Sequence, residues 1–170
     1  MQSPTSKKIS RITIRALCLA TLFVLSWVEW IVPLGVPGVK FGFSNLVILV
    51  FLSLFGFLEA FLMTGLKILL SAFLFQGFSS FLFTMAGSIG ACMAMAVGMH
   101  LYRKEKISMA GVSALGGFSH ITLQYLMSML VLKSTAVFGL YPVAAIITLF
   151  TSVVIGIIAE LLTKRLSKIL

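Results

Sequence analysis

Residues 45–75 read NLVILVFLSLFGFLEAFLMTGLKILLSAFLF, an apolar stretch with only a few polar side chains. At about 31 residues it is longer than the roughly 20 residues that one membrane-spanning helix needs. Gly56 interrupts it, and glycine commonly stands at the point where a helix ends. The stretch therefore predicts a short helix over 45–55, a tight turn at Gly56 and a membrane-spanning helix over 57–75.

The remainder of the chain has the same character. Of its 170 residues, 60% are apolar and 10% are charged, whereas soluble proteins have about 45–50% and 25%. Apolar runs follow one another along the chain, separated by short breaks such as the one at 76–80. We predict an all-α polytopic membrane protein, a single integral membrane domain over residues 1–170 with six transmembrane helices. The expected helices cover 12–32, 45–55, 57–75, 80–101, 109–131 and 142–163.

Positive charges gather between the predicted helices and at the two ends of the chain. The net charge is +9, but no basic face interleaved with aromatic residues accompanies it, so we expect no nucleic-acid partner. Cytoplasmic segments of membrane proteins are rich in Lys and Arg. This rule predicts a multi-pass protein of the cell membrane, embedded in the lipid bilayer, with both termini and the loop at 103–106 in the cytoplasm. The clusters are Lys7, Lys8, Arg11 and Arg15, then Arg103, Lys104 and Lys106, and finally Lys164, Arg165 and Lys168.

Acidic residues are too few for most metal or phosphate chemistry. The chain has no Asp, and its four acids are Glu29, Glu59, Glu105 and Glu160. Its two cysteines lie inside apolar runs and cannot form a zinc or iron–sulfur site. A Walker A motif is also absent, so any ATP hydrolysis must come from partner subunits. We therefore expect no metal, no cofactor and no catalytic activity.

Three polar side chains lie inside predicted membrane-spanning helices. Lys67 is near the middle of its helix, where a charged group costs roughly 2.5–3.5 kcal/mol on insertion scales. It either makes an ion pair or carbonyl contact inside the bundle or faces a polar or anionic ligand. His120 and Gln124 lie one helical turn apart on one face, which fits an interhelical hydrogen bond or ligand contacts. Gly116 and Gly117 are expected to open space beside this helix.

Two further polar positions are assigned from their neighbours in the sequence. Glu29 stands between Trp27 and Trp30, and tryptophan is typical of the membrane–water interface, so we place this acid at the outer interface. Ser44 or Asn45 is expected to cap the helix that follows.

Small residues recur at every fourth position in two predicted helices. Such residues allow membrane helices to approach closely and therefore mark contact faces. The longer series predicts a contact inside the bundle or, alternatively, a contact between subunits. It consists of Ala86, Gly90, Ala94 and Gly98, and the shorter series is the pair Ala16 and Ala20.

The segment PGVKFGFSN at 37–45, with Leu66-Lys67 and the later residues 111–124, resembles one small family of bacterial membrane proteins. That family is recorded as component I of heptaprenyl diphosphate synthase and as Gx transporter, and it is similar to the S components of energy-coupling-factor (ECF) vitamin transporters. The resemblance extends roughly from residue 12 to residue 163. The chain departs from the family pattern at Ile121, which follows His120 where the family usually has Asn.

The resemblance implies an S-component-like bundle with a ligand pocket under the loop that joins the first two helices, open to the outer face. In S components an Ala-x-x-x-Ala pair on the first helix docks the coupling subunit, and Ala16 and Ala20 match that spacing. The implied partners are a small-molecule ligand, a coupling subunit and the ATPases of an ECF-type transporter.

We therefore expect a membrane substrate-binding subunit for the uptake or handling of a small molecule such as a vitamin, a flavin precursor or an isoprenoid. Two alternatives stay open: a membrane subunit of a flavin- or quinone-linked electron-transfer system, and a non-catalytic membrane component of heptaprenyl diphosphate synthase. The expected polar ligand contacts are Lys40, Asn45, Lys67, His120 and Gln124. The expected apolar walls are Phe41, Phe43, Phe78 and Phe83.

Overall fold

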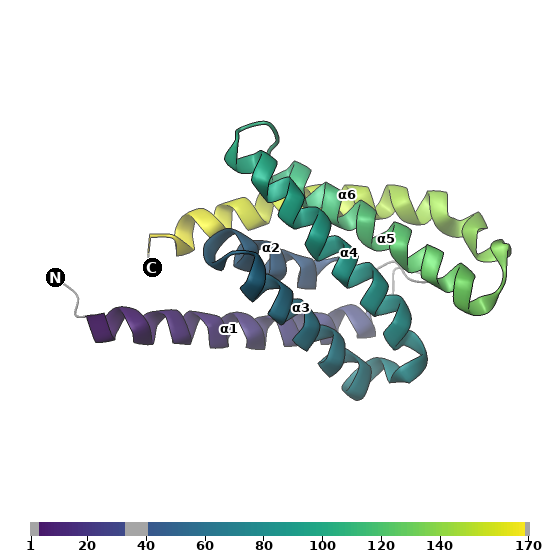
Figure 1. The fold of residues 1–170 in the computed structure, drawn as a ribbon, viewed down its shortest axis with the longest axis horizontal. Coiled ribbons are helices and arrows are strands. Elements are labelled where there is room, and N and C mark those ends of the chain that lie inside the picture. Colours follow the sequence, from purple (N-terminus) through teal and green to yellow (C-terminus); the bar gives the residue numbers. More distant parts are fainter. Residues whose placement is uncertain (1–3, 33–40, 169–170) are drawn as a thin grey trace.

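A computed structural model describes residues 4–32 and 41–168, and within them the side chains of residues 12–32, 41–74 and 81–168. The prediction of an all-α protein with six helices is confirmed (Figure 1). The elements are α1 (Pro4–Ile31), α2 (Phe43–Phe55), α3 (Phe57–Ser71), a π-helical segment η1 (Ala72–Gln76), α4 (Gly77–Arg103), α5 (Met109–Leu132), a 3-10 helix η2 (Thr135–Leu140) and α6 (Tyr141–Leu166).

Among the described residues, five helical segments are long and apolar enough to cross a membrane, which makes the chain a multi-pass membrane protein. The second helix differs from them in length. It has 13 residues, so at 1.5 Å per residue it is about 20 Å long, shorter than a hydrocarbon core of about 30 Å. The five long segments are Ile12–Ile31, Phe57–Leu74, Phe81–Arg103, Met109–Leu132 and Thr135–Leu166.

The short helix α2 forms the centre of the bundle. It contacts every one of the other five helices (Figure 1). Six consecutive residues, from Val47 to Leu52, are buried. A helix that is apolar on all sides belongs in the interior of a protein. Protein rather than lipid therefore surrounds α2, and this explains how so short a helix fits inside the fold.

The predicted turn at Gly56 is confirmed, whereas the predicted loop at 76–80 is wrong. Gly56 has φ +95° between α2 and α3, a conformation that L side chains rarely adopt. Residues 76–80 are helical, because η1 carries the chain from α3 directly into α4 at Gly77. A π-helical turn departs from regular α-helical geometry. The chain reverses its direction here, so that α4 runs back from the end of α3 (Figure 1).

Glycines bring α4, α5 and α6 into close contact. A methyl group added at Gly90 of α4 would lie 2.0 Å from Leu123 of α5. The contact inside the bundle, one of the two predicted alternatives for this series, is therefore present at Gly90. The space expected beside Gly116 and Gly117 does not exist, because Met95 fills the first position and Ser152 the second.

Ion pairs lie near one end of the bundle. Arg15 of α1 pairs with Glu59 of α3, and its guanidinium carbon lies 5.2 Å from the centre of the Phe55 ring. These contacts join α1 to the junction between α2 and α3. Lys164 and Glu160 form the other pair among the described residues, at 2.7 Å within α6.

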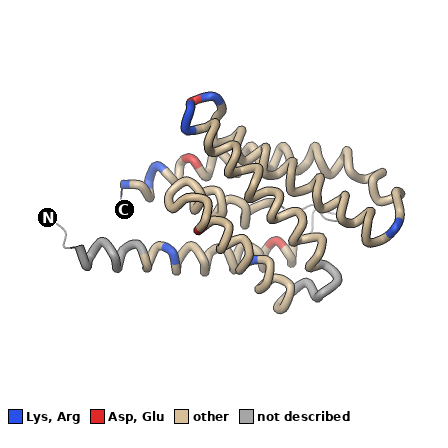
Figure 2. The backbone as a smooth tube through the Cα atoms, in the orientation of Figure 1, with Lys and Arg blue, Asp and Glu red and all other residues tan. Residues whose placement is uncertain are grey.

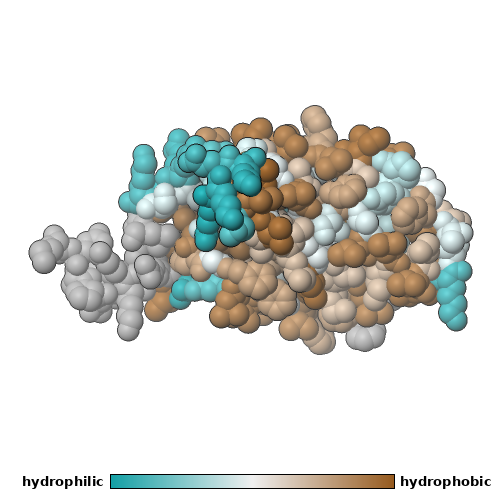
Figure 3. Space-filling model, turned by 45° about the horizontal axis from the view of Figure 1, so that its top comes forward, coloured by the Kyte–Doolittle hydropathy of each residue, from teal (hydrophilic) through white to brown (hydrophobic). Residues whose placement is uncertain are grey.

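The surface divides into polar ends and an apolar middle. In Figure 2, Lys and Arg lie at the connection between α4 and α5 and at the end of α6, which share one end of the bundle. Lys133 lies at the opposite end. Most of the surface between is hydrophobic (Figure 3), and Phe73 is 86% exposed. This asymmetry agrees with the charge pattern of the sequence, and the cytoplasmic placement of the basic end stays a prediction.

We predict the orientation with single cysteines placed at opposite ends, in a chain from which Cys18 and Cys92 have been replaced by Ala. A membrane-impermeant maleimide added to intact cells should modify Lys133→Cys and leave Lys104→Cys unmodified until the cells are permeabilised. The reason is the preference of Lys and Arg clusters for the cytoplasmic side. Labelling of Lys104→Cys in intact cells would show the reverse orientation.

Candidate functional site

A small polar cavity lies where the six helices meet. Its volume is about 30 Å³, and each of the six helices contributes to its wall. Hydroxyl side chains predominate among the lining residues. They are Ser26, Glu29, Gly42, Ser44, Asn45, Lys67, Ser71, Thr84, Ser88, His120, Ile121, Gln124, Thr148, Thr151 and Ser152.

The cavity brings together four of the five residues expected to contact a ligand, namely Asn45, Lys67, His120 and Gln124. They come from α2, α3 and α5, so helices far apart in the sequence meet at one point. The fifth residue, Lys40, lies outside the described residues.

The expected phenylalanine walls are not part of this cavity where side chains are described. Phe41 and Phe43 stack on each other with ring centres 5.3 Å apart, and neither they nor Phe83 line it. The side chain of Phe78 lies outside the described residues. Serine and threonine hydroxyls take the place of the expected aromatic walls, so the cavity is more polar than the sequence suggested.

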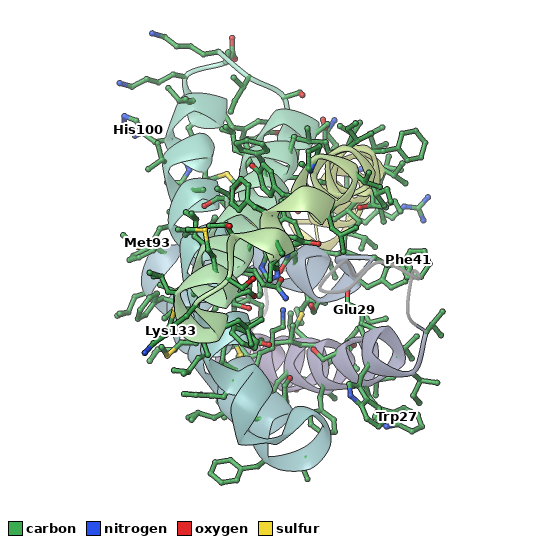
Figure 4. The ribbon with its side chains drawn as sticks, turned by 90° about the vertical axis from the view of Figure 1, so that its right-hand side faces the viewer. Trp27, Glu29, Phe41, Met93, His100 and Lys133 are labelled. Atoms are coloured by element: carbon green, nitrogen blue, oxygen red, sulfur yellow. The ribbon has the colours of Figure 1, made fainter. Side chains whose placement is uncertain are left out.

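Glu29 occupies the cavity wall and not the outer surface, so its predicted place at the interface is wrong. Its side chain is 5% exposed, whereas Trp27 and Trp30 are 46% and 50% exposed. In Figure 4, Glu29 lies on the side of α1 that faces the neighbouring helices, and Trp27 points away from them. Helical periodicity explains the difference, because Glu29 continues the buried face that includes Leu22 and Ser26.

The carboxylate of Glu29 holds the first turn of α2. The backbone N–H of Ser44 donates to Oε1 at 3.2 Å, and the Ser44 hydroxyl donates to Oε2 at 2.8 Å. The first N–H groups of a helix have no partner within the helix, and the positive end of its dipole favours an anion. Glu29 thus stabilises α2 from a different helix.

The predicted cap at Ser44 or Asn45 is therefore wrong. The residue at the cap position is Gly42, with φ +84°, and glycine has no side-chain oxygen that could accept a hydrogen bond. Its carbonyl accepts hydrogen bonds from the N–H groups of Asn45 and Leu46, at 2.9 and 3.2 Å. The helix begins two residues earlier than predicted, and the side chain of Asn45 becomes available to the cavity.

At least four buried polar atoms of the lining residues have no hydrogen-bond partner within the part of the chain that the structure describes. They are Asn45 Oδ1, Ser88 Oγ, Gln124 Oε1 and Thr148 Oγ1. Leaving such an atom unsatisfied costs about 1–3 kcal/mol, and unsatisfied buried groups call for a water, an ion or a ligand. The cavity exceeds the 10–15 Å³ that one water needs.

Other hydroxyls in the same bundle donate hydrogen bonds to backbone carbonyls of their own helix. Ser26 donates to the carbonyl of Leu22 at 2.7 Å, and Thr64 donates to that of Ala60 at 2.8 Å. Such bonds within a helix are common for Ser and Thr. Because Ser88 and Thr148 lack them, their hydroxyls are available to a group inside the cavity.

The ionisable side chains of the wall are Glu29, Lys67 and His120. Lys67 is 8% exposed and comes from the middle of α3. Within the described residues, no group of three His, Cys, Asp or Glu side chains is placed to hold a metal ion. The wall thus offers one acid, one amine, one imidazole, two amides and several hydroxyls for hydrogen bonding.

Sequence reasoning missed Glu29 and the hydroxyl residues, although a local signal exists. Each of the helices α1, α3, α4, α5 and α6 carries two polar residues of the cavity three or four positions apart, which places both on one face. Inside an apolar helix, such a pair marks the side that faces other helices and not lipid. The pairs are Ser26 and Glu29, Lys67 and Ser71, Thr84 and Ser88, His120 and Gln124, and Thr148 and Ser152.

A second hollow lies on the outer surface, formed by the start of α3 and the second half of α4. Its volume is about 440 Å³, and its lining residues are Phe57, Met93, Ala96, Val97 and His100. Met93 and His100 point outward on the same side of the molecule (Figure 4). It is open and almost entirely apolar, so it has the character of the lipid-facing surface and not of a polar binding site.

Ala16 and Ala20, the residues expected to dock a coupling subunit, are both exposed on α1. Their neighbours Ile12 and Leu17 are 62% and 65% exposed. The pair therefore lies on an outer face of the bundle and not at a contact between described helices. This face is open to lipid or to another protein.

We predict that Glu29→Ala lowers the free energy of unfolding by about 1–3 kcal/mol, because it leaves the Ser44 N–H and hydroxyl without an acceptor in the interior. Denaturant titration of the purified protein in detergent measures this loss. Glu160→Ala is the matched control, since Glu160 pairs with Lys164 at an exposed position, where such pairs contribute little. Equal losses for the two variants would contradict the capping role.

Comparison with known proteins gives one family. The family model described as heptaprenyl diphosphate synthase component I matches residues 17–162 of the chain. This range extends from α1 to α6 and includes every residue that lines the cavity. No curated protein and no solved structure matches.

Proposed function

The chain belongs to the heptaprenyl diphosphate synthase component I family, and we propose that it is a membrane substrate-binding subunit, similar to an S component. It captures a small molecule, such as a vitamin, a flavin precursor or an isoprenoid, in the polar cavity at the centre of the bundle. Its role is binding and not catalysis. The complete absence of Asp supports this, because aspartate-rich motifs hold magnesium on the diphosphate in prenyl diphosphate synthases.

The observation that carries the proposal is the convergence of four unsatisfied polar atoms on one cavity. A polar contact that only joins helices satisfies its own donors and acceptors, as the hydroxyl contact of 2.8 Å between Thr122 and Tyr141 does. Unsatisfied groups lower stability, and a fold that retains four of them around one space is typical of a binding site.

The size of the cavity defines how binding proceeds. Its volume of about 30 Å³ is far below the 300–1,000 Å³ of sites for drug-sized molecules. Capture of a vitamin-sized molecule therefore requires the helices around the cavity to separate. A bound molecule then satisfies the polar atoms of the wall and stabilises the wider arrangement.

Purification in native lipid, followed by mass spectrometry of the molecules released on denaturation, tests the proposal. A vitamin or flavin precursor supports the substrate-binding subunit. A quinone or an intact flavin cofactor supports the electron-transfer subunit, and a prenyl diphosphate supports the non-catalytic synthase component. Absence of any stoichiometric small molecule from native preparations, with none gained from a vitamin mixture, would contradict the proposal.

We predict that Gln124→Leu raises the thermal stability of the ligand-free protein and lowers the amount of co-purified small molecule per folded chain. The substitution removes a buried oxygen that has no partner among the described residues, at a similar side-chain volume. Thr122→Val is the matched control on α5, since Thr122 contacts Tyr141 and does not line the cavity. It should lower stability slightly and leave the co-purified molecule unchanged. Unchanged binding in Gln124→Leu would contradict the site.

We also propose that the exposed pair Ala16 and Ala20 docks a coupling subunit, whose ATPases supply the energy for transport. Small residues permit close approach of a partner helix, and Ala16→Trp is therefore expected to abolish co-purification with a co-expressed coupling subunit. Val97→Trp is the matched control, since Val97 is 66% exposed on α4. Co-purification of Ala16→Trp at the wild-type level, with the chain folded, would contradict docking at this pair.

A further inference from the structure

We infer that the cavity accepts an electrically neutral group that both donates and accepts hydrogen bonds, and that it rejects diphosphates. The inference rests on the proposed function, because it names the chemical class of the molecule that the same cavity binds. It follows from two properties of the wall: its balance of charge and its supply of hydrogen-bonding atoms.

The two oppositely charged groups of the wall are Glu29 and Lys67. They are 5% and 8% exposed and line the same cavity. Both oxygens of Glu29 accept hydrogen bonds from Ser44. In a low-dielectric interior, charges interact far more strongly than in water. The acid and the amine therefore offset each other.

This balance changes the interpretation of Lys67. Taken alone, a buried amine attracts an anionic ligand, as the sequence suggested. With Glu29 in the same wall, the amine already has a compensating charge. His120 is the remaining ionisable group of the wall, and it adds at most one positive charge. A diphosphate group carries two or more negative charges, and burying them without counter-charges is strongly unfavourable.

The amides and hydroxyls select for hydrogen-bond donors as well as acceptors. Asn45 Oδ1 and Gln124 Oε1 are acceptors without a partner among the described residues, and the Ser88 and Thr148 hydroxyls either donate or accept. A molecule with N–H or O–H groups satisfies the amide oxygens. A quinone offers only acceptors, so it leaves those oxygens unsatisfied.

Charge balance is tested with Glu29→Gln, Lys67→Gln and the double variant, each purified in nanodiscs. Each single substitution leaves one buried charge without its counter-charge and should lower the melting temperature. The double variant should recover most of that loss, because its cavity is neutral again. A single variant that fails to fold while the double variant folds supports the same conclusion. If the double variant lost as much melting temperature as the two single variants together, Glu29 and Lys67 would not balance each other's charge.

Calorimetry with inorganic pyrophosphate tests the rejection of diphosphates. Wild type should bind it only weakly, whereas Glu29→Gln should bind it roughly tenfold to hundredfold more tightly than wild type, because the wall then carries a net positive charge. Gln124→Lys adds a positive charge without changing Glu29 and should also gain binding. Glu160→Gln is the control, which removes a partly exposed acid that does not line the cavity, and it should behave as wild type. The inference would be overturned if wild type bound pyrophosphate tightly and Lys67→Gln abolished that binding. It would also be overturned if neither Glu29→Gln nor Gln124→Lys bound pyrophosphate more tightly than wild type.

The identity of the co-purified molecule completes the test. A neutral molecule with at least one N–H or O–H group supports the inference, and a prenyl diphosphate or a quinone overturns it while leaving a binding role in place. Absence of any small molecule has a different meaning. It overturns the binding role itself, whatever the outcome of the charge variants.

Discussion

The rest of the bundle depends on the position of the short helix α2, whose first turn needs hydrogen-bond acceptors inside the protein. The hydrogen bonds from Ser44 to Glu29 meet this need. A helix about 20 Å long cannot place both ends in water across a membrane about 30 Å thick. The first N–H groups of α2 must therefore find acceptors within the protein, because an unsatisfied backbone group there costs several kcal/mol. A carboxylate from α1 meets this requirement, and it fixes where α1 lies relative to α2.

The same carboxylate connects the core to the cavity. Because Glu29 both holds α2 and lines the cavity, the position of the central helix and the shape of the binding wall are set together. The other helices pack around α2, with glycines that allow close approach of α4, α5 and α6. Each of them delivers polar side chains to the same point. The site is thus a product of the whole bundle and not of one motif.

Two opposite environments are separated by the thickness of a single helix. The outer faces carry exposed side chains such as Phe73 and Phe150, which suit lipid. The centre carries an acid, an amine, amides and hydroxyls that a bilayer disfavours. A purely structural core would gain stability from apolar residues there. Retention of a polar centre is therefore an argument for function, and its near-neutral charge limits which chemistry fits.

The sequence by itself determined the class of the protein, its six helices, the break at Gly56 and the interior positions of Lys67, His120 and Gln124. These features follow from apolar length and helical spacing, which are local properties. Only the tertiary structure decided that Glu29 turns inward to hold α2, that hydroxyls replace the expected aromatic walls, and that Met95 and Ser152 fill the space beside two glycines. Each of these depends on which helix lies opposite, and the pattern of one helix does not specify its neighbour.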